Sequence, residues 1–516
     1  MKLLRYISTL IHLKPEQIFF QALEHIHTHK FKLYESPSQT YILQVTRPIP
    51  KHKSYQDGHF CFLNISSKFN GWDDDTYGPL WTYNLNYMDW IQQPDISPDE
   101  CALWIDRFIQ DSANNKIGFA PYPTSLRCIN WIKFFSNNPD YATQNRLDHL
   151  YSQLVLLSIS TERNIGGNHL LENVSAMIIG ASFFKDKRMA NAGKRLMKRE
   201  IKRQILPDGA HFEQSPMYHC VILERILDCI NYTISDSAGL LFRDKIHDYL
   251  INSAKAMIGH LKNIVWDDGT IPLTNDSALG IAPDSTHLLD YAHRLGIDSE
   301  AISMKECGYR RLRTDRMNML ADVGNITATF QPGHSHADTF SYELRIDGKP
   351  FIVDTGISTY QKDERRQYER GTEAHNTVVL DGRDSSEVWS GFRVGRRAQV
   401  TIKTDTDSII EACHNGFGRN HIHHRIFRAV QDCIEIQDIV TGAGGTVSLI
   451  HFAPDVVVKE YDSTHILTDR AQITFSGATD IRIIQEQAST EYNRLKAVYV
   501  SKISFTRKLE YRITAL

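Results

Sequence analysis

The hydrophobic positions follow a helical period over the first long stretch of the chain, from about residue 90 to residue 295. Apolar residues recur there at i, i+3, i+4 and i+7, which places them on one face of an α-helix. Six segments show this spacing: DECALWIDRFIQD, RLDHLYSQLVLLSIST, NHLLENVSAMIIGASFF, RMANAGKRLMKREIKRQI, PMYHCVILERILDCINYTI and FRDKIHDYLINSAKAMIGHLKNI. Short turns separate them, which predicts antiparallel helix pairs stacked as a bundle, a solenoid or a closed toroid.

From about residue 317 onward the period changes to two. A series of short segments alternates or runs apolar over strand lengths, among them NITATF, SYELRI, AQITFSG, DIRIIQ and LEYRIT. Asp347 and Gly348 form a two-residue hairpin signal that pairs SYELRI with KPFIVD and places Asp354 opposite Ser341. Many strands with almost no helix predict a β-sandwich of two packed sheets. The first 80 residues are less regular, with a helical pattern near residues 15–29.

Composition narrows the class of protein. The 516 residues carry a formal net charge of -3, with 41% hydrophobic and 23% charged residues, which is typical of a globular protein and gives no support to a nucleic-acid partner. No apolar run approaches the roughly 18 residues of a membrane span. The N-terminal MKLLRYISTLIHLKPEQIFF lacks a clean apolar core and a cleavage site, so we expect no signal peptide. The eight cysteines form no CxxC pair and are expected to be reduced thiols, which favours the cytoplasm and leaves the periplasm open.

The first candidate constellation is GGNHLLENVS, residues 166–175. Two glycines break the chain before a helical pattern, and Asn168, His169, Glu172 and Asn173 then share one helix face near its N-terminus. Hydrogen-bond donors in this position suit an anion. The alternative is that the same side chains cap the helix and face solvent.

The second is LPDGAHFEQSPMYHCVILE, residues 206–224. Ser215 is predicted to cap a helix whose first residue is Pro216, which places Tyr218 and His219 in the first turn. A tyrosine there either packs on the helical domain or takes part in chemistry.

The third is QPGHSHADTFSYELRIDGKPFIVDTG, residues 331–356. If His336 extended the strand, it would lie roughly 17 Å from Asp354 at ~3.4 Å per residue, so a shared metal requires this segment to fold back. His375 supplies a further imidazole, and two histidines with one aspartate form an acceptable zinc set. The alternative is a sheet edge with solvated polar residues.

These motifs, taken together, resemble those of the heparinase II/III-like family of polysaccharide lyases. The matching stretches are GPLWTYNLNYMDW, RCINW, GGNHLLEN, LPDGAHFEQSPMYH, GTIPLTNDS, GHSHADTFSYEL, PFIVDTGISTY and ERGTEAHNTVVLDG, and they span about residues 70 to 385. The resemblance implies an α+β multidomain fold, with an incomplete (α/α) toroid followed by an antiparallel β-sandwich. We divide the chain into residues 1–85 packed on the toroid, the toroid at 86–308 and the sandwich at 309–516, with an active site between the last two.

The resemblance also implies roles for individual residues. Asn168 and His169 correspond to the pair that neutralises the substrate carboxylate, Tyr218 to the catalytic tyrosine and His334 to a catalytic histidine. His336, Asp354 and His375 fall on the ligands of a structural zinc ion. Four further residues are expected to bind substrate: Tyr360, Glu172, Arg127 and Trp81.

Such a lyase would cleave an acidic, uronate-containing polysaccharide by β-elimination. The donors of Asn168 and His169 would stabilise the charge that develops as the C5 proton leaves. Either Tyr218 acts as acid and His334 as base, or Tyr218 does both and His334 positions it. The chain resembles the family's shorter members, of the kind found with the synthesis of bacterial capsules or exopolysaccharides. This resemblance implies a bacterial polymer of that kind as the substrate.

Two other functions remain open at the level of the sequence. A glycoside hydrolase on the same scaffold would use a pair of carboxylates, with these candidates: Glu172, Glu213, Asp267 and Asp268. The other alternative is a non-catalytic glycan-binding component of polysaccharide biosynthesis. The sequence leaves the oligomeric state open.

Overall fold

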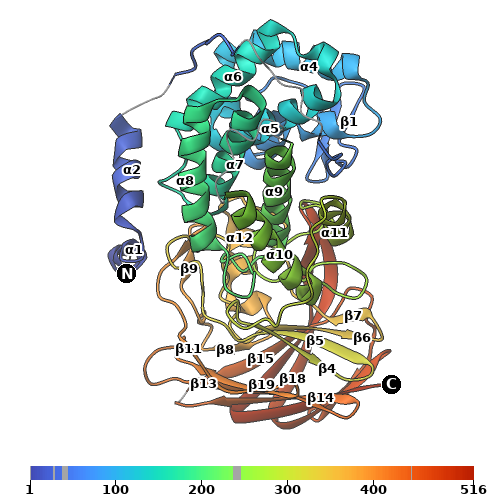
Figure 1. Ribbon diagram of the computed structural model, residues 1–516. Coiled ribbons are helices and arrows are strands. Elements are labelled where there is room, and N and C mark those ends of the chain that lie inside the picture. The colour runs from blue at the N-terminus through green and yellow to red at the C-terminus, as the bar shows by residue number, and fades with distance from the viewer. Residues whose placement is uncertain (1, 27–29, 38–44, 236–245, 443) are drawn as a thin grey trace.

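The computed structural model describes residues 2–26, 30–37, 45–235, 246–442 and 444–516. Most helices form one body and the long strands form a second body beneath it (Figure 1). The protein is therefore α+β, with a helical toroid that precedes an antiparallel β-sandwich. Its two bodies follow the two periods of the sequence.

The helical body is built from amphipathic helices of 9 to 19 residues. They are α3 (Pro79–Tyr87), α4 (Pro98–Asp111), α5 (Pro121–Asn137), α6 (Gln144–Ile159), α7 (Gly167–Phe184), α8 (Lys187–Gln204), α9 (Pro216–Ile234), α10 (Ile246–Ile264) and α11 (Ser285–Arg294). In α4, the Ser97 hydroxyl accepts a hydrogen bond from the Glu100 N–H at 3.2 Å and caps the helix, with Pro98 at its first position. The buried residues of α4 include Cys101, Trp104, Ile105 and Phe108, the predicted spacing of a core-facing stripe.

The helix N-termini of α5, α7 and α9 lie at one end of this body. Tyr122 of α5 packs on His169 of α7, with ring centroids 4.4 Å apart, and Asn168 of α7 contacts His334 of the β-rich body. Tyr218 at the start of α9 contacts the same histidine. This end of the toroid therefore faces the strands.

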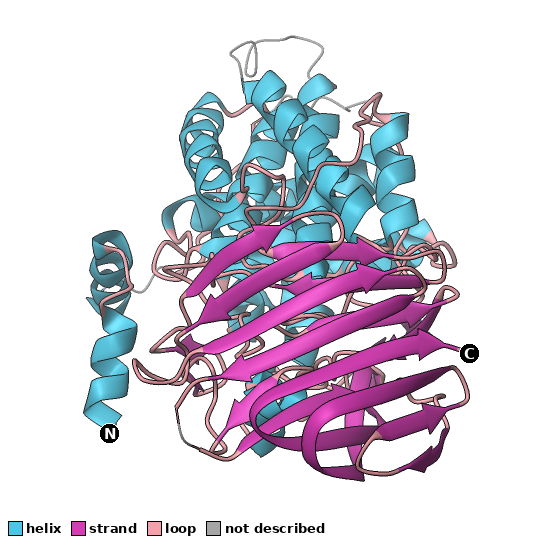
Figure 2. Cartoon of the chain, turned by 90° about the horizontal axis from the view of Figure 1, so that it is seen from below, coloured by secondary structure: helices cyan, strands magenta, loops and turns pink. Residues whose placement is uncertain are grey.

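The β-rich body contains a ten-stranded antiparallel sheet and a four-stranded sheet. The large sheet has the order β11-β12-β13-β14-β19-β18-β17-β16, with β15 paired to both β19 and β8, and the small sheet has the order β4-β5-β6-β7. The strands are β4 (Tyr309–Arg313), β5 (Met317–Asp322), β6 (Tyr342–Ile346), β7 (Lys349–Ile352), β8 (Val378–Leu380), β9 (Val388–Trp389), β10 (Arg393–Val394), β11 (Val400–Asp405), β12 (Ile409–His414), β13 (His423–Val430), β14 (Cys433–Val440), β15 (Thr446–His451), β16 (Val458–Tyr461), β17 (His465–Thr468), β18 (Ala471–Glu491) and β19 (Arg494–Ala515); the helix α12 (Glu364–Arg370) lies among them. Both sheets bury apolar residues in one shared core, for example Leu344 and Ile513, which is the packing of a sandwich. Figure 2 shows the long strands of the large sheet crossing this body side by side.

NITATF, residues 325–330, was expected as a strand, but these residues form no strand, and β5 ends before them at Asp322. Where strands do form, they differ from the prediction at two places. The Asp347-Gly348 turn is present, with φ values of 48° and 76°, and it pairs Ile346 with Lys349. A bulge then shifts the register, and β7 ends at Ile352, so Asp354 leaves the ladder instead of facing Ser341.

The second difference concerns the length of the last two strands. AQITFSG and DIRIIQ were expected as separate strands, but both lie in the 21-residue β18. Gly477 does not end the strand: it sits in a bulge at φ 88°, where a Cβ atom would lie 2.3 Å from the Lys508 carbonyl oxygen. A bulge keeps the ladder with β19 continuous where a turn would have broken it.

The N-terminal arm, α1 (Lys2–Leu10) and α2 (Pro15–Ile26), lies outside the helical body (Figure 1). Glu16 of α2 pairs with Arg199 of α8 at 2.7 Å, and Arg5 of α1 pairs with Glu387 of the β-rich body at 2.8 Å. The arm therefore touches both bodies. The expected helix near residues 15–29 is α2; residues 27–29 lie outside the described residues. Three short strands follow, β1 (Tyr55–Gln56), β2 (His59–Phe62) and β3 (Ile65–Lys68).

All eight cysteines are free thiols, as predicted. Among the described helices, none combines the length and the apolar character needed to cross a bilayer. The division at residues 85 and 308 stays a prediction; α11 ends at Arg294 and β4 begins at Tyr309.

Candidate active site between the two bodies

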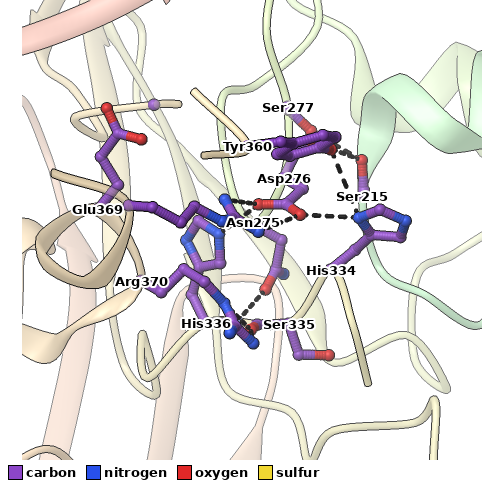
Figure 3. Close-up of polar contacts among 12 residues, drawn as sticks. Ser215, Asn275, Asp276, Ser277, His334, Ser335, His336, Tyr360, Glu369 and Arg370 are labelled. Atoms are coloured by element: carbon purple, nitrogen blue, oxygen red, sulfur yellow. Dashed lines mark hydrogen bonds and ion pairs between the residues drawn. The ribbon is translucent and has the colours of Figure 1, made fainter. Parts of the chain in front are cut away.

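The carboxylate of Asp276 is the centre of a buried polar network between the helical and β-rich bodies (Figure 3). Arg366 of α12 holds both of its oxygens, at 2.5 and 2.6 Å. His334 Nδ1 lies 2.7 Å from one oxygen and His336 Nε2 lies 2.8 Å from the other. Burial by itself would raise the pKa of Asp276, but Arg366 and the two imidazoles hold the pKa well below its usual value. Asp276 is therefore ionised and accepts all of these hydrogen bonds.

An ionised Asp276 fixes the tautomer of His334. Because the carboxylate has no proton, Nδ1 of His334 must carry the hydrogen between them, and a neutral ring then has its lone pair on Nε2. Nε2 lies 3.3 Å from Asn168 Nδ2 and 3.8 Å from Glu213 Oε2. The imidazole thus presents its proton-accepting nitrogen toward the helical body.

The segment that carries His334 is attached to the Asp276 loop through its backbone. The Asp276 N–H donates to the His334 carbonyl at 3.1 Å, and the His336 N–H donates to Asn275 Oδ1 at 2.9 Å. Arg370 donates to the Ser335 carbonyl at 2.9 Å. The fold-back that the sequence required of residues 331–338 is therefore held by hydrogen bonds to two other segments.

Tyr218 lies directly against His334. Their ring centroids are 3.9 Å apart, with an angle of 30° between the ring planes. The Tyr218 hydroxyl is 3.1 Å from the Tyr360 hydroxyl, which in turn is 3.4 Å from His334 Nδ1. Burial raises the pKa of the Tyr218 phenol well above its usual value, so this side chain carries its proton at neutral pH.

Ser215 positions Tyr218. Its hydroxyl accepts a hydrogen bond from the Tyr218 N–H at 3.2 Å and donates to the Asp276 carbonyl at 2.6 Å. The predicted helix cap is therefore correct, and it also joins the start of α9 to the Asp276 loop.

Asn168 is held at the first turn of α7 by Glu213. Its backbone N–H donates to Glu213 Oε1 at 3.2 Å and its Nδ2 donates to Oε2 at 3.0 Å. The close approach requires Gly167, where φ is 57° and a Cβ atom would lie 2.4 Å from Glu213 Oε1. The buried Asn168 Oδ1 has no hydrogen-bond partner among the described residues.

His169 lies on the same turn and is 30% exposed. Its Nδ1 is 3.0 Å from Glu162 Oε1, and Asn173 Nδ2 donates to the other Glu162 oxygen at 3.1 Å. Burial by itself would lower the pKa of His169, but the Glu162 carboxylate raises the pKa above its usual value. The ring is thereby favoured as a charged donor at the edge of the site.

Three residues that were expected to bind substrate lie in the interior instead. Trp81 is 1% exposed and donates to the Ile65 carbonyl, and Arg127 is 0% exposed and donates to Gln153 at 2.7 Å. Glu172 is 0% exposed and pairs with Arg225 at 2.8 Å. These three side chains have almost no solvent-facing surface and no observed contact with the Asp276 network, so a direct substrate contact stays a prediction for them. Tyr360 does lie in the site.

The three expected zinc ligands are buried near Asp276, but their ligand atoms do not all come within the spacing of a metal site. The His336 and His375 rings are 5.3 Å apart, and Asp354 Oδ2 is 2.8 Å from His375 Nδ1. Two buried nitrogens, His336 Nδ1 and His375 Nε2, have no hydrogen-bond partner among the described residues. Burial lowers the pKa of His336 to about 4, so this ring is neutral and its Nδ1 lone pair is available. The donor chemistry fits a metal ion.

A different set of residues meets the spacing of a metal site more closely. Asp208, His260 and Cys307 each bring one ligand atom within 4.8 Å of the others, and all three are buried. Within the described part of the chain this is the set with that spacing. The three residues lie far apart in the chain, so no local spacing marks them as a set.

The residues that organise the site were not predicted as such from the sequence. Asp276 lies inside GTIPLTNDS, a stretch that was noted without a role, and Glu213 was considered only as the acid of a hydrolase. Arg366 lies in a charged run, DERRQYER, that has no distinguishing spacing. A buried ion pair of this kind becomes visible only when the two bodies are placed together.

Two family models together match most of the chain. Residues 61–292 match the heparinase II/III N-terminus and residues 297–513 match the heparinase II/III-like C-terminal domain. The chain belongs to the heparinase II/III-like family. The first 60 residues, which include the N-terminal arm, precede the matched part of this family member.

Relatives in the family are similar over part of their length. A heparin-sulfate lyase of Bacteroides stercoris is 25% identical over 375 residues, which cover 64% of this chain and 54% of that protein. A heparin-sulfate lyase of Bacteroides thetaiotaomicron is 20% identical over 446 residues, which cover 76% of this chain and 59% of that protein. The chain spans about half the length of the curated relatives it matches.

Solved structures of the family share the fold. A crystal structure of heparinase III superposes with a TM-score of 0.67 at 14% identity, covering 97% of this chain and 91% of that one. A chondroitin AC lyase of Streptomyces coelicolor A3 in complex with chondroitin sulphate gives a TM-score of 0.54 at 10% identity, covering 87% of this chain and 76% of that one. At these identities the likeness shows the toroid and sandwich, and it does not extend to substrate.

Proposed function

We propose that this protein is a polysaccharide lyase that cleaves a uronate-containing glycan by β-elimination. The observation that carries the proposal is the stacking of Tyr218 on His334 at the junction of the two bodies, with Nε2 of His334 left as a proton acceptor by Asp276. The named activity of the Bacteroides relatives supports the same reaction class.

The reaction requires one base, one acid and a way to stabilise negative charge. His334 Nε2 takes the C5 proton, and the electron pair of the broken C–H bond forms the C4–C5 double bond. The C4–O bond breaks, and the Tyr218 hydroxyl gives its proton to the leaving oxygen. Tyr218 fits the acid because its raised pKa keeps it protonated. The alternative, in which Tyr218 serves as both base and acid, requires a phenolate that this buried environment disfavours.

Asn168 and His169 are placed to hold the substrate carboxylate. Asn168 Nδ2 lies 3.3 Å from His334 Nε2, so a carboxylate there would neighbour the base. As the C5 proton leaves, charge moves onto that carboxylate, and donors fixed in a dry site stabilise it by roughly 3–4 kcal/mol each. Glu213 and Glu162 keep the two donors in position.

A zinc ion would be held by His336, His375 and Asp354. When bound, it would cross-link the strand and loop that carry His334, as a structural metal does. The partnerless nitrogens of His336 and His375 support this assignment. The carboxylate of Asp276, which holds His336 Nε2, would orient that ligand from the second coordination sphere.

The proposed substrate is an acidic bacterial polymer, such as a capsule or exopolysaccharide, and the proposed location is the cytoplasm. Eight free thiols are the usage expected in a reducing compartment.

The test is a panel of uronate polymers, including the host's own exopolysaccharide, followed by ultraviolet absorbance. Elimination creates a conjugated unsaturated uronate that absorbs, whereas hydrolysis releases reducing ends without new absorbance. Reducing ends without absorbance would establish the hydrolase, and binding without cleavage of any member would establish the non-catalytic component.

A further inference from the structure

A large hollow in the helical body adjoins the candidate site and includes residues of the N-terminal arm. Its volume is about 1170 Å³, above the roughly 300–1,000 Å³ of ordinary small-molecule pockets. Its walls come from α2, from residues 30–31, from the connection between α4 and α5, and from the end of α6 with the residues that follow. It has room for more than one sugar ring.

Two wall segments lead directly to the groups around His169. Pro121 lines the hollow, and the next residue, Tyr122, packs on His169 with ring centroids 4.4 Å apart. Thr161 also lines it, and the next residue, Glu162, contacts His169 Nδ1 at 3.0 Å. The hollow therefore adjoins the candidate site on two independent segments.

The charges of the wall suit an acidic ligand. Lys30, Lys116 and Arg163 supply three cationic side chains, and the two lysines are exposed. One acidic residue, Glu24, also lines the hollow, and its carboxylate accepts a hydrogen bond from Asn164 Nδ2 at 2.6 Å. The net charge of the lining is positive, although the whole chain carries a net charge of -3.

Aromatic side chains between these cations suit the faces of sugar rings. Phe31 packs on Phe119 with ring centroids 4.9 Å apart, and the Arg163 guanidinium lies 5.0 Å from the centroid of the Phe20 ring. All three phenylalanines line the hollow and are half-buried. Flat apolar surfaces flanked by cations fit a polymer that alternates ring faces with carboxylates.

The arm side of the hollow precedes the part of the chain that the family models match. The family match begins at residue 61, whereas Phe20, Lys30 and Phe31 precede it. We propose that the hollow is a subsite that binds acidic sugar residues beyond the one held at Tyr218, and that the arm thereby gives the protein a preference for long chains. This inference rests on the proposed function for the class of ligand.

The test measures binding instead of cleavage. Fluorescently labelled heparosan oligosaccharides, which alternate glucuronate with N-acetylglucosamine, are titrated as tetrasaccharide and dodecasaccharide onto the full chain carrying Tyr218→Phe. In that background, the triple variant Lys30→Gln, Lys116→Gln and Arg163→Gln is compared with a control triple of the same charge change: Lys255→Gln, Lys403→Gln and Lys459→Gln, all exposed and outside the hollow.

We expect the dodecasaccharide to bind more tightly than the tetrasaccharide, and the hollow triple to reduce this advantage by about tenfold, since three cationic contacts with the sugar carboxylates are removed. The control triple is expected to retain it. A carboxyl-reduced, neutral dodecasaccharide is expected to show no such advantage. Equal losses in both triples, no length dependence, or no binding of the dodecasaccharide would each overturn the subsite.

The binding test of the subsite and the ultraviolet test of the elimination can fail independently. Length-dependent binding that the hollow triple removes, with no ultraviolet product from any polymer, would leave the subsite in place and remove the elimination. An ultraviolet product from the wild-type chain, without length-dependent binding, would do the reverse.

Discussion

The Tyr218 phenol and the His334 imidazole are stacked at 3.9 Å although 116 positions separate them in the chain and they belong to different bodies. Asp276 connects the two, since its carboxylate holds His334 Nδ1 and its carbonyl accepts from Ser215, which caps the helix of Tyr218. An acid and a base therefore meet in one small volume, and a sugar ring between Asn168 and Tyr218 would contact both.

Replacing Tyr218 by Phe is expected to lower the rate of elimination by about 10²–10⁴-fold, because the leaving oxygen loses its proton donor. The thermal unfolding midpoint is expected to change little, since the ring still packs on His334. Tyr232→Phe is the matched control, because it removes a buried hydroxyl from the same helix, α9. Normal turnover of the Tyr218 variant would take this residue out of the mechanism.

Asp276→Asn is expected to lower turnover by about 10²–10⁴-fold and to destabilise the fold by about 3–5 kcal/mol. The amide no longer fixes the Nδ1–H tautomer of His334, and it leaves Arg366 without its buried partner. The pH–rate profile and the urea midpoint test the two effects separately.

Asp268→Asn is the control for Asp276→Asn, because Asp268 pairs with Arg345 at 2.6 Å but its side chain is 50% exposed. That variant is expected to lose about 1 kcal/mol or less. An Asp276→Asn protein with the wild-type pH–rate profile would show that the carboxylate does not set the state of His334.

His211 is expected to make the fold sensitive to acid. Burial lowers its pKa to about 4 from 6.5. The folded state therefore keeps His211 neutral, while the unfolded chain binds a proton below pH 6.5, so stability is present above 6.5 and is lost as the pH falls toward 4. The loss from this one group is up to about 3 kcal/mol.

His211→Gln tests this origin of the acid sensitivity, since its amide nitrogen can still donate to Gln204, the present partner of Nε2 at 3.1 Å. Urea unfolding at pH 7 and pH 4.5 is expected to show a smaller loss in the variant than in the wild type. Parallel pH dependence in the two proteins would assign the sensitivity to other groups.

Metal analysis of the purified chain is expected to give one zinc ion, which His336→Ala and His375→Ala remove and Cys307→Ser retains. The two histidines carry the partnerless buried nitrogens, and their loss should also lower the unfolding temperature. Loss of zinc from the Cys307 variant alone would instead place the ion at Asp208, His260 and Cys307.

Local signals were enough to predict many of the helices and strands and the cap at Ser215, because these depend on neighbouring residues. The buried apolar face of α4 follows from a hydrophobic period of 3.6 residues. The Asp347-Gly348 turn follows from turn-forming residues between two segments with a period of two. Asn168, Tyr218, His334 and Tyr360 were found through the resemblance to the family, and the structure brings all four together.

The features that could not be predicted from the sequence depend on contacts between distant segments. Glycine is required in the bulge at position 477 because the Lys508 carbonyl oxygen of the partner strand leaves no space for a Cβ atom. Arg127 was expected to bind substrate, yet it is fully buried and donates to Gln153 and to the Asn86 carbonyl. Asp276 becomes the centre of the site only when Arg366 arrives from the β-rich body.

The position of β19 has a consequence for biosynthesis. This strand, residues 494–515, pairs with β14, β15 and β18 in the middle of the large sheet. A ribosome therefore releases most of the sandwich before the strand that joins its halves has been made, and such non-local pairing is slow. A nascent chain would therefore carry the helical body without a finished sandwich beneath it until this last strand has been translated.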